Sequence, residues 1–307
     1  MKWKRLGCVW APDGSIPWAV SHAHIPTPYL LDRERIRVYF AVLDRQKFGR
    51  VTFVDVAAED PSRVLYVHDR TCLDVGSLGA FDDCGAVPSC AIRVGDEVRL
   101  YYIGFQRTFR TPYMLFSGMA TSDTRAECFE RCSPSPMLDR TADEPYSRGA
   151  PFVMTTASGF RMWYWSCTQW TQTDHGVHYN NSIRHATSRD GLRWEVEPEP
   201  CLTPTGQEFS LGRPWVVETA AGQYTMLYSA RAHDEKYRIG MAVSDDGVHW
   251  TREDHDVGLC RSAQGWDSEM VCYPATLQVQ GRTYLFYNGN GHGSTGFGCA
   301  VLDSAWR

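Results

Sequence analysis

A unit of about 60 residues recurs five times along the chain, and this repeat limits the possible folds more than any other feature of the sequence. Each copy opens with a short apolar run that contains a proline. Successive prolines are 60, 63, 63 and 60 residues apart, and they are Pro28, Pro88, Pro151, Pro214 and Pro274. About a dozen residues later, each copy carries a second run rich in aromatic and β-branched residues, which favour strands.

The remainder of each copy predicts two more strands. In the third and fourth copies, residues 188–197 and 244–253 place an Asp-Gly pair between two extended runs, which is a strong hairpin signal. No long segment shows the apolar spacing of a helix. Four strands in each of five copies predict an all-β, five-bladed β-propeller that occupies residues 1–307 as one domain. The alternative is a β-sandwich with accidental spacing.

The two ends of the chain predict how the ring closes. The fifth copy stops after its third strand, at GFGCAVL, whereas WKRLGCVWAP, which starts at Trp3, matches a fourth strand with no other strand of its unit before it. We therefore expect the N-terminal strand to complete the last blade, because closure removes an open sheet edge.

Composition excludes several functions. The net charge is −5 and there is no basic run, so nucleic acid is not an expected partner. Neither a secretory signal nor a membrane-spanning stretch is visible. The eleven cysteines are an odd number with no CxxC pair, which favours reduced thiols in a cytoplasmic protein. The oligomeric state is not predictable from the sequence.

Charged residues gather just before the prolines, where inner strands of a propeller would line a central pocket. Among them we predict four catalytic carboxylates: Asp83 and Glu269 as the main acid/base pair, with Asp267 and Glu208 assisting. Carboxylates that share a partly desolvated pocket push their pKa values apart, which lets one act as an acid and another as a base. Hydrolysis of a glycosidic bond needs such a pair.

Eight further residues are predicted to bind the substrate, a small molecule or an oligosaccharide: His22, His24, Asp82, Tyr146, Arg148, Arg213, Trp266 and His292. Arginines would clamp an anionic group, histidines would orient the substrate, and tryptophan would stack on a sugar face. No cofactor is expected, although His24 and His292 could hold a metal ion.

Structural roles are the alternative for several of these residues. Asp83 could cap a turn, Glu208 could pair with Arg213, and Arg148 and Arg213 could be structural spokes that pair with carboxylates.

The chain resembles the five-bladed β-propeller glycosidases of family 43 and their relatives in families 32, 62, 68, 117 and 130. The resemblance covers nearly the whole chain. It rests on the proline-led strands, the aromatic strands, the segment GAFDDCGAVPSC and two S-x-D-G-x-x-W hairpins that begin at Ser188 and Ser244. It also extends to uncharacterised glycosidase-like proteins of bacterial polysaccharide gene clusters, which implies no particular activity.

The resemblance implies an aspartate from blade one, an aspartate from a following blade, a glutamate acid and a histidine at the pocket floor. Asp83 matches the blade-two carboxylate, Glu208 is nearest to the glutamate acid, and His292 resembles the floor histidine. In the phosphorylases of family 130, basic residues bind phosphate, a role that Arg148 and Arg213 would suit.

Blade one departs from the family pattern, because SHAHIPTPYLL contains no Asp or Glu. Either His24 replaces the base, or Asp267 or Glu269 supplies it, or the site is not hydrolytic. Three functions therefore stay open: a glycosidase-like enzyme, a non-hydrolytic enzyme (transferase, phosphorylase, lyase or cyclase) on the same scaffold, and a non-catalytic carbohydrate-binding propeller.

Overall fold

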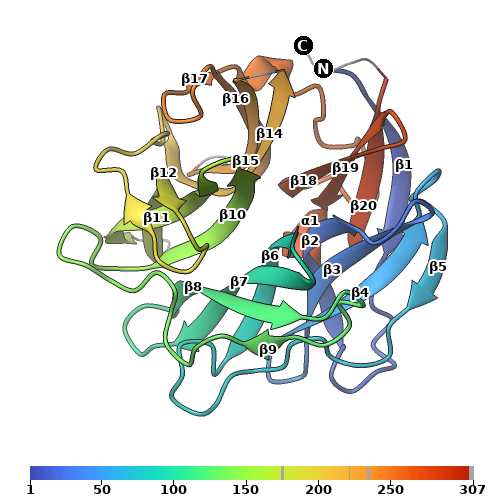
Figure 1. Cartoon of the computed structure of the whole chain (residues 1–307), viewed down its shortest axis with the longest axis horizontal. Coiled ribbons are helices and arrows are strands. Elements are labelled where there is room, and N and C mark those ends of the chain that lie inside the picture. Colours follow the sequence, from blue (N-terminus) through green and yellow to red (C-terminus); the bar gives the residue numbers. More distant parts are fainter. Residues whose placement is uncertain (174–175, 221, 234–235, 304–307) are drawn as a thin grey trace.

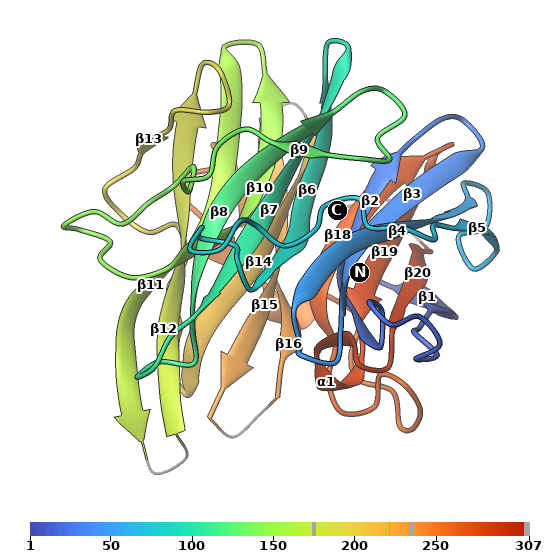
Figure 2. The same ribbon diagram turned by 90° about the horizontal axis from the view of Figure 1, so that it is seen from below.

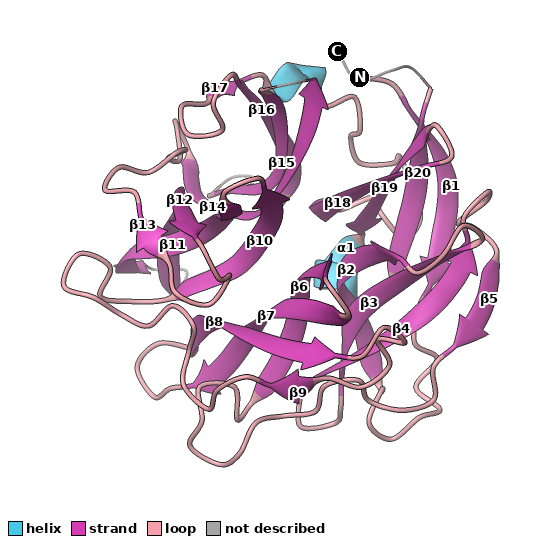
Figure 3. Ribbon diagram, viewed as in Figure 1, coloured by secondary structure: helices cyan, strands magenta, loops and turns pink. Residues whose placement is uncertain are grey.

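The structure is a computed structural model that describes residues 1–173, 176–220, 222–233 and 236–303. Within these ranges the regular secondary structure is almost entirely strand (Figure 3). The exceptions in the described chain are a 3-10 turn, η1 (Asp254–Asp256), and a four-residue helix, α1 (Asn290–Gly293). Neither has the length and the apolar run of a membrane-spanning helix. The predicted all-β class is confirmed.

The described strands form a four-stranded and a sixteen-stranded sheet, within which antiparallel pairing links them in five groups of four, each of which we call a blade. Parallel bridges join neighbouring groups of the larger sheet. Blade one contains β2 (Ser21–Leu30), β3 (Arg35–Leu43), β4 (Gly49–Ala57) and β5 (Val64–Val67). Blade two contains β6 (Gly85–Val94), β7 (Glu97–Arg107), β8 (Tyr113–Ser122) and β9 (Glu130–Arg131). Blade three contains β10 (Arg148–Thr156), β11 (Gly159–Thr173), β12 (Gly176–Ser188) and β13 (Glu195–Val196).

The last two blades follow the same order. Blade four contains β14 (Glu208–Ala220), β15 (Gln223–Ala232), β16 (Arg238–Ser244) and β17 (Thr251–Arg252). Blade five contains β18 (Cys272–Val279), β19 (Arg282–Asn288), β20 (Phe297–Leu302) and, from the other end of the chain, β1 (Trp3–Trp10). The first strands β2, β6, β10, β14 and β18 contact one another in a closed ring, so the sheets are arranged around a central axis as in a β-propeller (Figure 1).

The N-terminal strand closes the last blade, as predicted. β1 pairs antiparallel with β20, from Trp3 opposite Leu302 to Trp10 opposite Phe297. Figure 1 shows the blue N-terminal strand beside the red C-terminal strand. The ring is thus closed by strand hydrogen bonds between residues from the two ends of the chain.

Close backbone approach joins neighbouring blades. One such contact is a parallel bridge between Gly49 of β4 and Gly85 of β6. A Cβ atom on Gly85 would lie 2.7 Å from the Gly49 nitrogen, and Gly85 has a φ of 152°. Only glycine fits at this position, because a side chain would push the two blades apart.

A β-bulge interrupts the first strand of every blade near its proline. In four blades the residue before the proline has a left-handed φ of 50–56°, and these residues are Ile25, Ala150, Arg213 and Tyr273. In blade one this proline is Pro26, so the prediction that Pro28 is the repeat counterpart is wrong by two residues. Both prolines lie in β2, and only the bulge distinguishes them.

The aromatic second strands form the core between blades. Tyr39, Tyr102, Tyr164, Tyr228 and Tyr287 are all fully buried, each in the second strand of its blade. Such side chains bury large areas and still carry a hydroxyl that needs a partner. The β11–β12 hairpin is longer than the others and projects beyond the neighbouring strands, on the side of the molecule where α1 lies (Figure 2).

Candidate functional site

A pocket of about 360 Å³ lies at the centre of the ring, and every blade contributes to its wall. This volume is within the usual range for small-molecule sites. The bulges explain part of its lining, because the residue before each proline faces it: Ile25, Val87, Ala150, Arg213 and Tyr273. Left-handed backbone at a non-glycine residue costs about 1 kcal/mol or more and is concentrated at functional sites.

Aromatic rings form one wall of the pocket. Trp170 and Tyr179 of the long hairpin meet edge to face at 5.6 Å, and the Tyr113 ring lies 6.2 Å from each. The Tyr179 hydroxyl is 3.0 Å from the hydroxyl of Tyr237. Burial raises the pKa of Tyr113 and Tyr237 well above the usual value, so both phenols stay protonated at neutral pH. The wall therefore offers flat apolar faces with hydroxyl groups at their edges.

Three histidines lie on the opposite side. The His24 ring is 5.1 Å from Tyr273, which in turn is 6.4 Å from His292, and the His22 ring is 6.5 Å from His24. Burial lowers the pKa of all three, that of His24 well below its usual value and that of His292 to about 4, with Arg231 adding to the effect at His292. At neutral pH these imidazoles are uncharged and can accept a proton.

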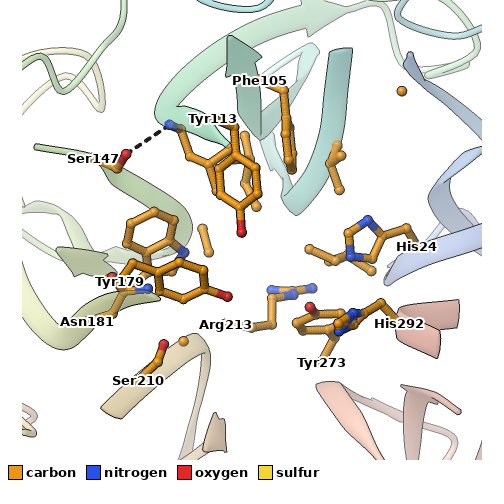
Figure 4. A pocket seen from close by; sticks show the side chains of 18 of the residues that line it. His24, Phe105, Tyr113, Ser147, Tyr179, Asn181, Ser210, Arg213, Tyr273 and His292 are labelled. Atoms are coloured by element: carbon orange, nitrogen blue, oxygen red, sulfur yellow. Dashed lines mark hydrogen bonds between the residues drawn. The ribbon is translucent and has the colours of Figure 1, made fainter. Parts of the chain in front are cut away.

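The pocket contains cations but no carboxylate among its described lining residues. The cations are Lys47, Arg213 and Arg231. Figure 4 shows the Arg213 guanidinium and the hydroxyls of Tyr113 and Tyr179 turned toward the middle of the cavity. No group of three or more His, Cys, Asp or Glu side chains in the described part of the chain is arranged to hold a metal ion.

Most of the predicted acids have structural partners in their own blades. Asp82 accepts hydrogen bonds from the Tyr102 hydroxyl at 3.0 Å and from Arg131 at 2.7 Å. Glu144 is bound in the same way, by the Tyr164 hydroxyl at 3.0 Å and by Arg148 at 2.8 Å. The predicted substrate-binding residue Arg148 is thus a spoke that pairs with a carboxylate.

The same arrangement recurs in the last two blades. Tyr228 donates to Asp254 at 2.6 Å, and Tyr287 donates to Asp267 at 3.0 Å. The arginine partners are Arg252, which binds both Asp254 and Glu208, and Arg5, which lies 3.2 Å from Asp267. Burial alone would raise the pKa of Glu208, but its hydrogen bond from Arg252 lowers it, so Glu208 stays ionised. We call these four sites the tyrosine–carboxylate–arginine clusters.

The remaining two catalytic candidates lie outside the pocket, Glu269 exposed and Asp83 half-buried. Glu269 pairs with Lys236, and both side chains are more than half exposed. Asp83 accepts a hydrogen bond from the Gly79 N–H at 3.0 Å, which is the turn-capping alternative. Neither residue lines the pocket.

Four predicted site residues do line the pocket: His22, His24, Arg213 and His292. The structure does not bring the other eight to it, and these are Asp82, Asp83, Tyr146, Arg148, Glu208, Trp266, Asp267 and Glu269. Trp266 packs instead on Tyr287, with ring centres 5.1 Å apart, and Tyr146 packs beside the pocket wall. The catalytic roles of the four carboxylates stay predictions without a shared site.

Sequence analysis missed the side chains that come from the hairpins between second and third strands. They are Tyr113, Tyr179, Arg231 and Tyr237, whereas His292, from the corresponding hairpin of blade five, was predicted. Their common signal is an aromatic or basic residue at the end of a second strand or at the start of a third. Apart from His292, the predicted pocket residues came from the proline-led strands and the segments just before them.

Comparison with known proteins gives relatives over the full length. No family model matches the chain. It is 36% identical over 306 residues to the uncharacterised proteins Rv1502 and MT1551 from two strains of Mycobacterium tuberculosis, covering 99% of this chain and 100% of each relative.

Solved structures share the fold at low identity. A glycosyl hydrolase from Bacteroides ovatus matches with a TM-score of 0.74 and 15% identity, over 98% of this chain and 93% of its own. A thermostable family-43 glycoside hydrolase matches with a TM-score of 0.65 and 15% identity, over 92% and 88%. The chain belongs to the family of Rv1502 and has the β-propeller fold found in family-43-like glycoside hydrolases.

Proposed function

We propose that the chain is a five-bladed, glycosidase-like enzyme that acts on a glycosidic bond or another bond of a sugar derivative held in the central pocket. The observation that carries this proposal is the pocket itself: aromatic faces opposite imidazoles, at the centre of a fold shared with glycoside hydrolases. Aromatic rings suit the apolar faces of sugars, and the phenols and imidazoles suit their hydroxyl groups.

The lining favours a non-hydrolytic reaction over two-carboxylate hydrolysis. Hydrolysis of that kind places two carboxyl groups on either side of the scissile bond, within about 10 Å of each other. The described pocket lining offers neither. Proton transfer would fall to the uncharged His24 and His292 as bases and to the protonated Tyr113 as an acid. Elimination and group transfer are the reaction classes that such a set suits.

The test is a panel of neutral and acidic oligosaccharides incubated with the protein in ¹⁸O-labelled water, with products analysed by mass spectrometry. Products without ¹⁸O that disappear in a His24→Gln variant support the proposal. A His249→Gln variant is the matched control, because His249 is exposed on a turn far from the pocket lining. Products carrying ¹⁸O would show that the reaction is a hydrolysis and would contradict the preference for elimination or transfer.

A non-catalytic carbohydrate-binding propeller is the second candidate, and the absence of a carboxylate from the described lining favours it. It predicts saturable binding with no product from any member of the panel. The location also belongs to the proposal: all eleven cysteines are unpaired, which supports a reducing compartment such as the cytoplasm.

A further inference from the structure

Arg213 is buried without a counter-ion at the floor of the pocket. Its side chain is 1% exposed. One terminal nitrogen, Nη2, lies 3.2 Å from the Thr27 hydroxyl and 3.4 Å from the Pro26 carbonyl. Nε and Nη1 have no hydrogen-bond partner in the described structure. The guanidinium also lies 4.9 Å from the ring centre of Trp215, where the aromatic face offers only partial compensation.

Other buried arginines of this protein are balanced by carboxylates. Arg37, 2% exposed, makes two hydrogen bonds to Asp55, at 2.7 and 2.9 Å. Arg148, 3% exposed, pairs with Glu144. A buried charge without a partner costs several kcal/mol. Arg213 therefore lacks the compensation that the fold gives elsewhere, and its guanidinium is turned toward the cavity that the residue lines (Figure 4).

The surroundings of Arg213 add positive charge and no negative charge. Arg231 and Lys47 are the other charged residues in the described lining. Burial lowers the pKa of Arg213 to about 9, which still leaves it cationic at neutral pH. The whole chain carries a net charge of −5, so the positive pocket is a local feature and not a consequence of overall composition.

We propose that Arg213 binds the carboxylate of an acidic sugar, so that the pocket selects uronic acids over neutral sugars. The inference rests on the proposed function only in placing a sugar in the pocket. One buried cation is balanced by one monoanion, and guanidinium and carboxylate groups match in shape and charge. A phosphate dianion would need a second cation at the floor, whereas Arg231 lies against Tyr179 and Tyr237.

The wild-type protein gives the first test, by calorimetric titration with matched pairs: D-galacturonate with D-galactose, and D-glucuronate with D-glucose. We expect at least one uronate to bind ten times more tightly than its neutral partner, or more. D-Glucose 6-phosphate is the third arm, and tighter binding of the phosphate than of every uronate would overturn the carboxylate assignment.

Variants give the second test. In Arg213→Met the preference for the uronate disappears, because the affinity for the uronate falls to that for the neutral sugar. Since Met fills a similar volume without a charge, the melting temperature of the ligand-free variant stays equal or rises by a few degrees. Arg213→Lys keeps the charge and retains a weaker preference. Arg70→Met, which removes an exposed arginine outside the pocket, behaves like the wild type.

Two outcomes separate failure of this inference from failure of the proposed function. If neutral sugars and uronates bind equally well and Arg213→Met melts at a lower temperature, Arg213 is a structural spoke, although the pocket still binds sugar. If no sugar of either kind binds, the proposed function fails together with the inference. The wild-type comparison decides the question even if a variant does not fold.

Discussion

The tyrosine–carboxylate–arginine clusters and the central pocket both contain tyrosines and buried arginines, but only the clusters pair the arginine with a carboxylate. In the Glu144 cluster, a tyrosine hydroxyl and Arg148 both bind one carboxylate, and the charges cancel inside the blade. At the pocket floor, Arg213 is as deeply buried as Arg148 but has no acid to pair with. The comparison shows that residue type does not distinguish a structural arginine from the one that we propose to bind the substrate. The missing counter-ion does.

The largest effect on stability is expected from removing the carboxylate of a tyrosine–carboxylate–arginine cluster. Glu144→Gln keeps the shape of the side chain but leaves Arg148 buried without its charge partner. Removing one member of a buried ion pair costs about 3–5 kcal/mol, so we expect a loss of that size in the free energy of unfolding, measured by urea denaturation. Uronate affinity of the folded fraction should not change.

Asp143→Asn is the matched control for that substitution, because Asp143 is exposed and adjacent in sequence. It should leave the urea midpoint where it is. A Glu144→Gln protein with wild-type stability and no ligand binding would contradict the structural role of the cluster, since the cluster would then belong to the functional site.

Lowering the pH should destabilise the fold, because some buried histidines are uncharged at neutral pH. His185 is 1% exposed and accepts a hydrogen bond from Arg161 at 3.0 Å. Burial, helped by Arg161, lowers the pKa of His185 to about 4, and that of His292 in the pocket is also about 4. Between the unfolded value of about 6.5 and pH 4 the unfolded chain binds more protons, so stability falls as the pH falls.

We expect His185 to account for about 1–3 kcal/mol of the loss between pH 7 and pH 4. His185→Gln should flatten that part of the stability profile, measured by urea unfolding at several pH values, without changing uronate affinity at pH 7. His249→Gln, on an exposed turn, serves as the control and should leave the profile unchanged. An unaltered slope in His185→Gln would contradict the pKa assignment.

The repeat made the fold predictable. The site was hard to predict, because it depends on which charged residues pair with each other in three dimensions. Proline-led strands and a leftover strand at the N-terminus are local patterns, and they were enough for the architecture and the closure by β1. The acids before the prolines looked catalytic because their tyrosine partners, such as Tyr287 for Asp267, lie about 20 residues away in the second strand of the same blade. No spacing rule in a single sequence reveals that pairing.

The sequence predicted Arg213 and Arg148 to bind the substrate on the same grounds, but only Arg213 lines the pocket. Both lie within three residues before the proline of an inner strand, and the sequence offered the same two roles for each. The bulges, however, align Arg213 with Ala150 and not with Arg148. Deciding between these roles requires knowing whether a carboxylate stands opposite the guanidinium in three dimensions.

The smallest effects are expected for the two carboxylates that lie outside both regions, Glu269 and Asp83. The Glu269–Lys236 pair is exposed, and exposed pairs contribute about 0–1 kcal/mol, so Glu269→Gln should hardly change the urea midpoint. Asp83→Asn keeps an oxygen that can accept the Gly79 hydrogen bond and should behave similarly. Neither substitution should alter uronate binding or turnover, because neither side chain lines the pocket. A large loss of turnover at wild-type stability in either variant would instead support the prediction that Asp83 and Glu269 are the main acid/base pair. The loops that carry them would then have to reach the substrate during the reaction.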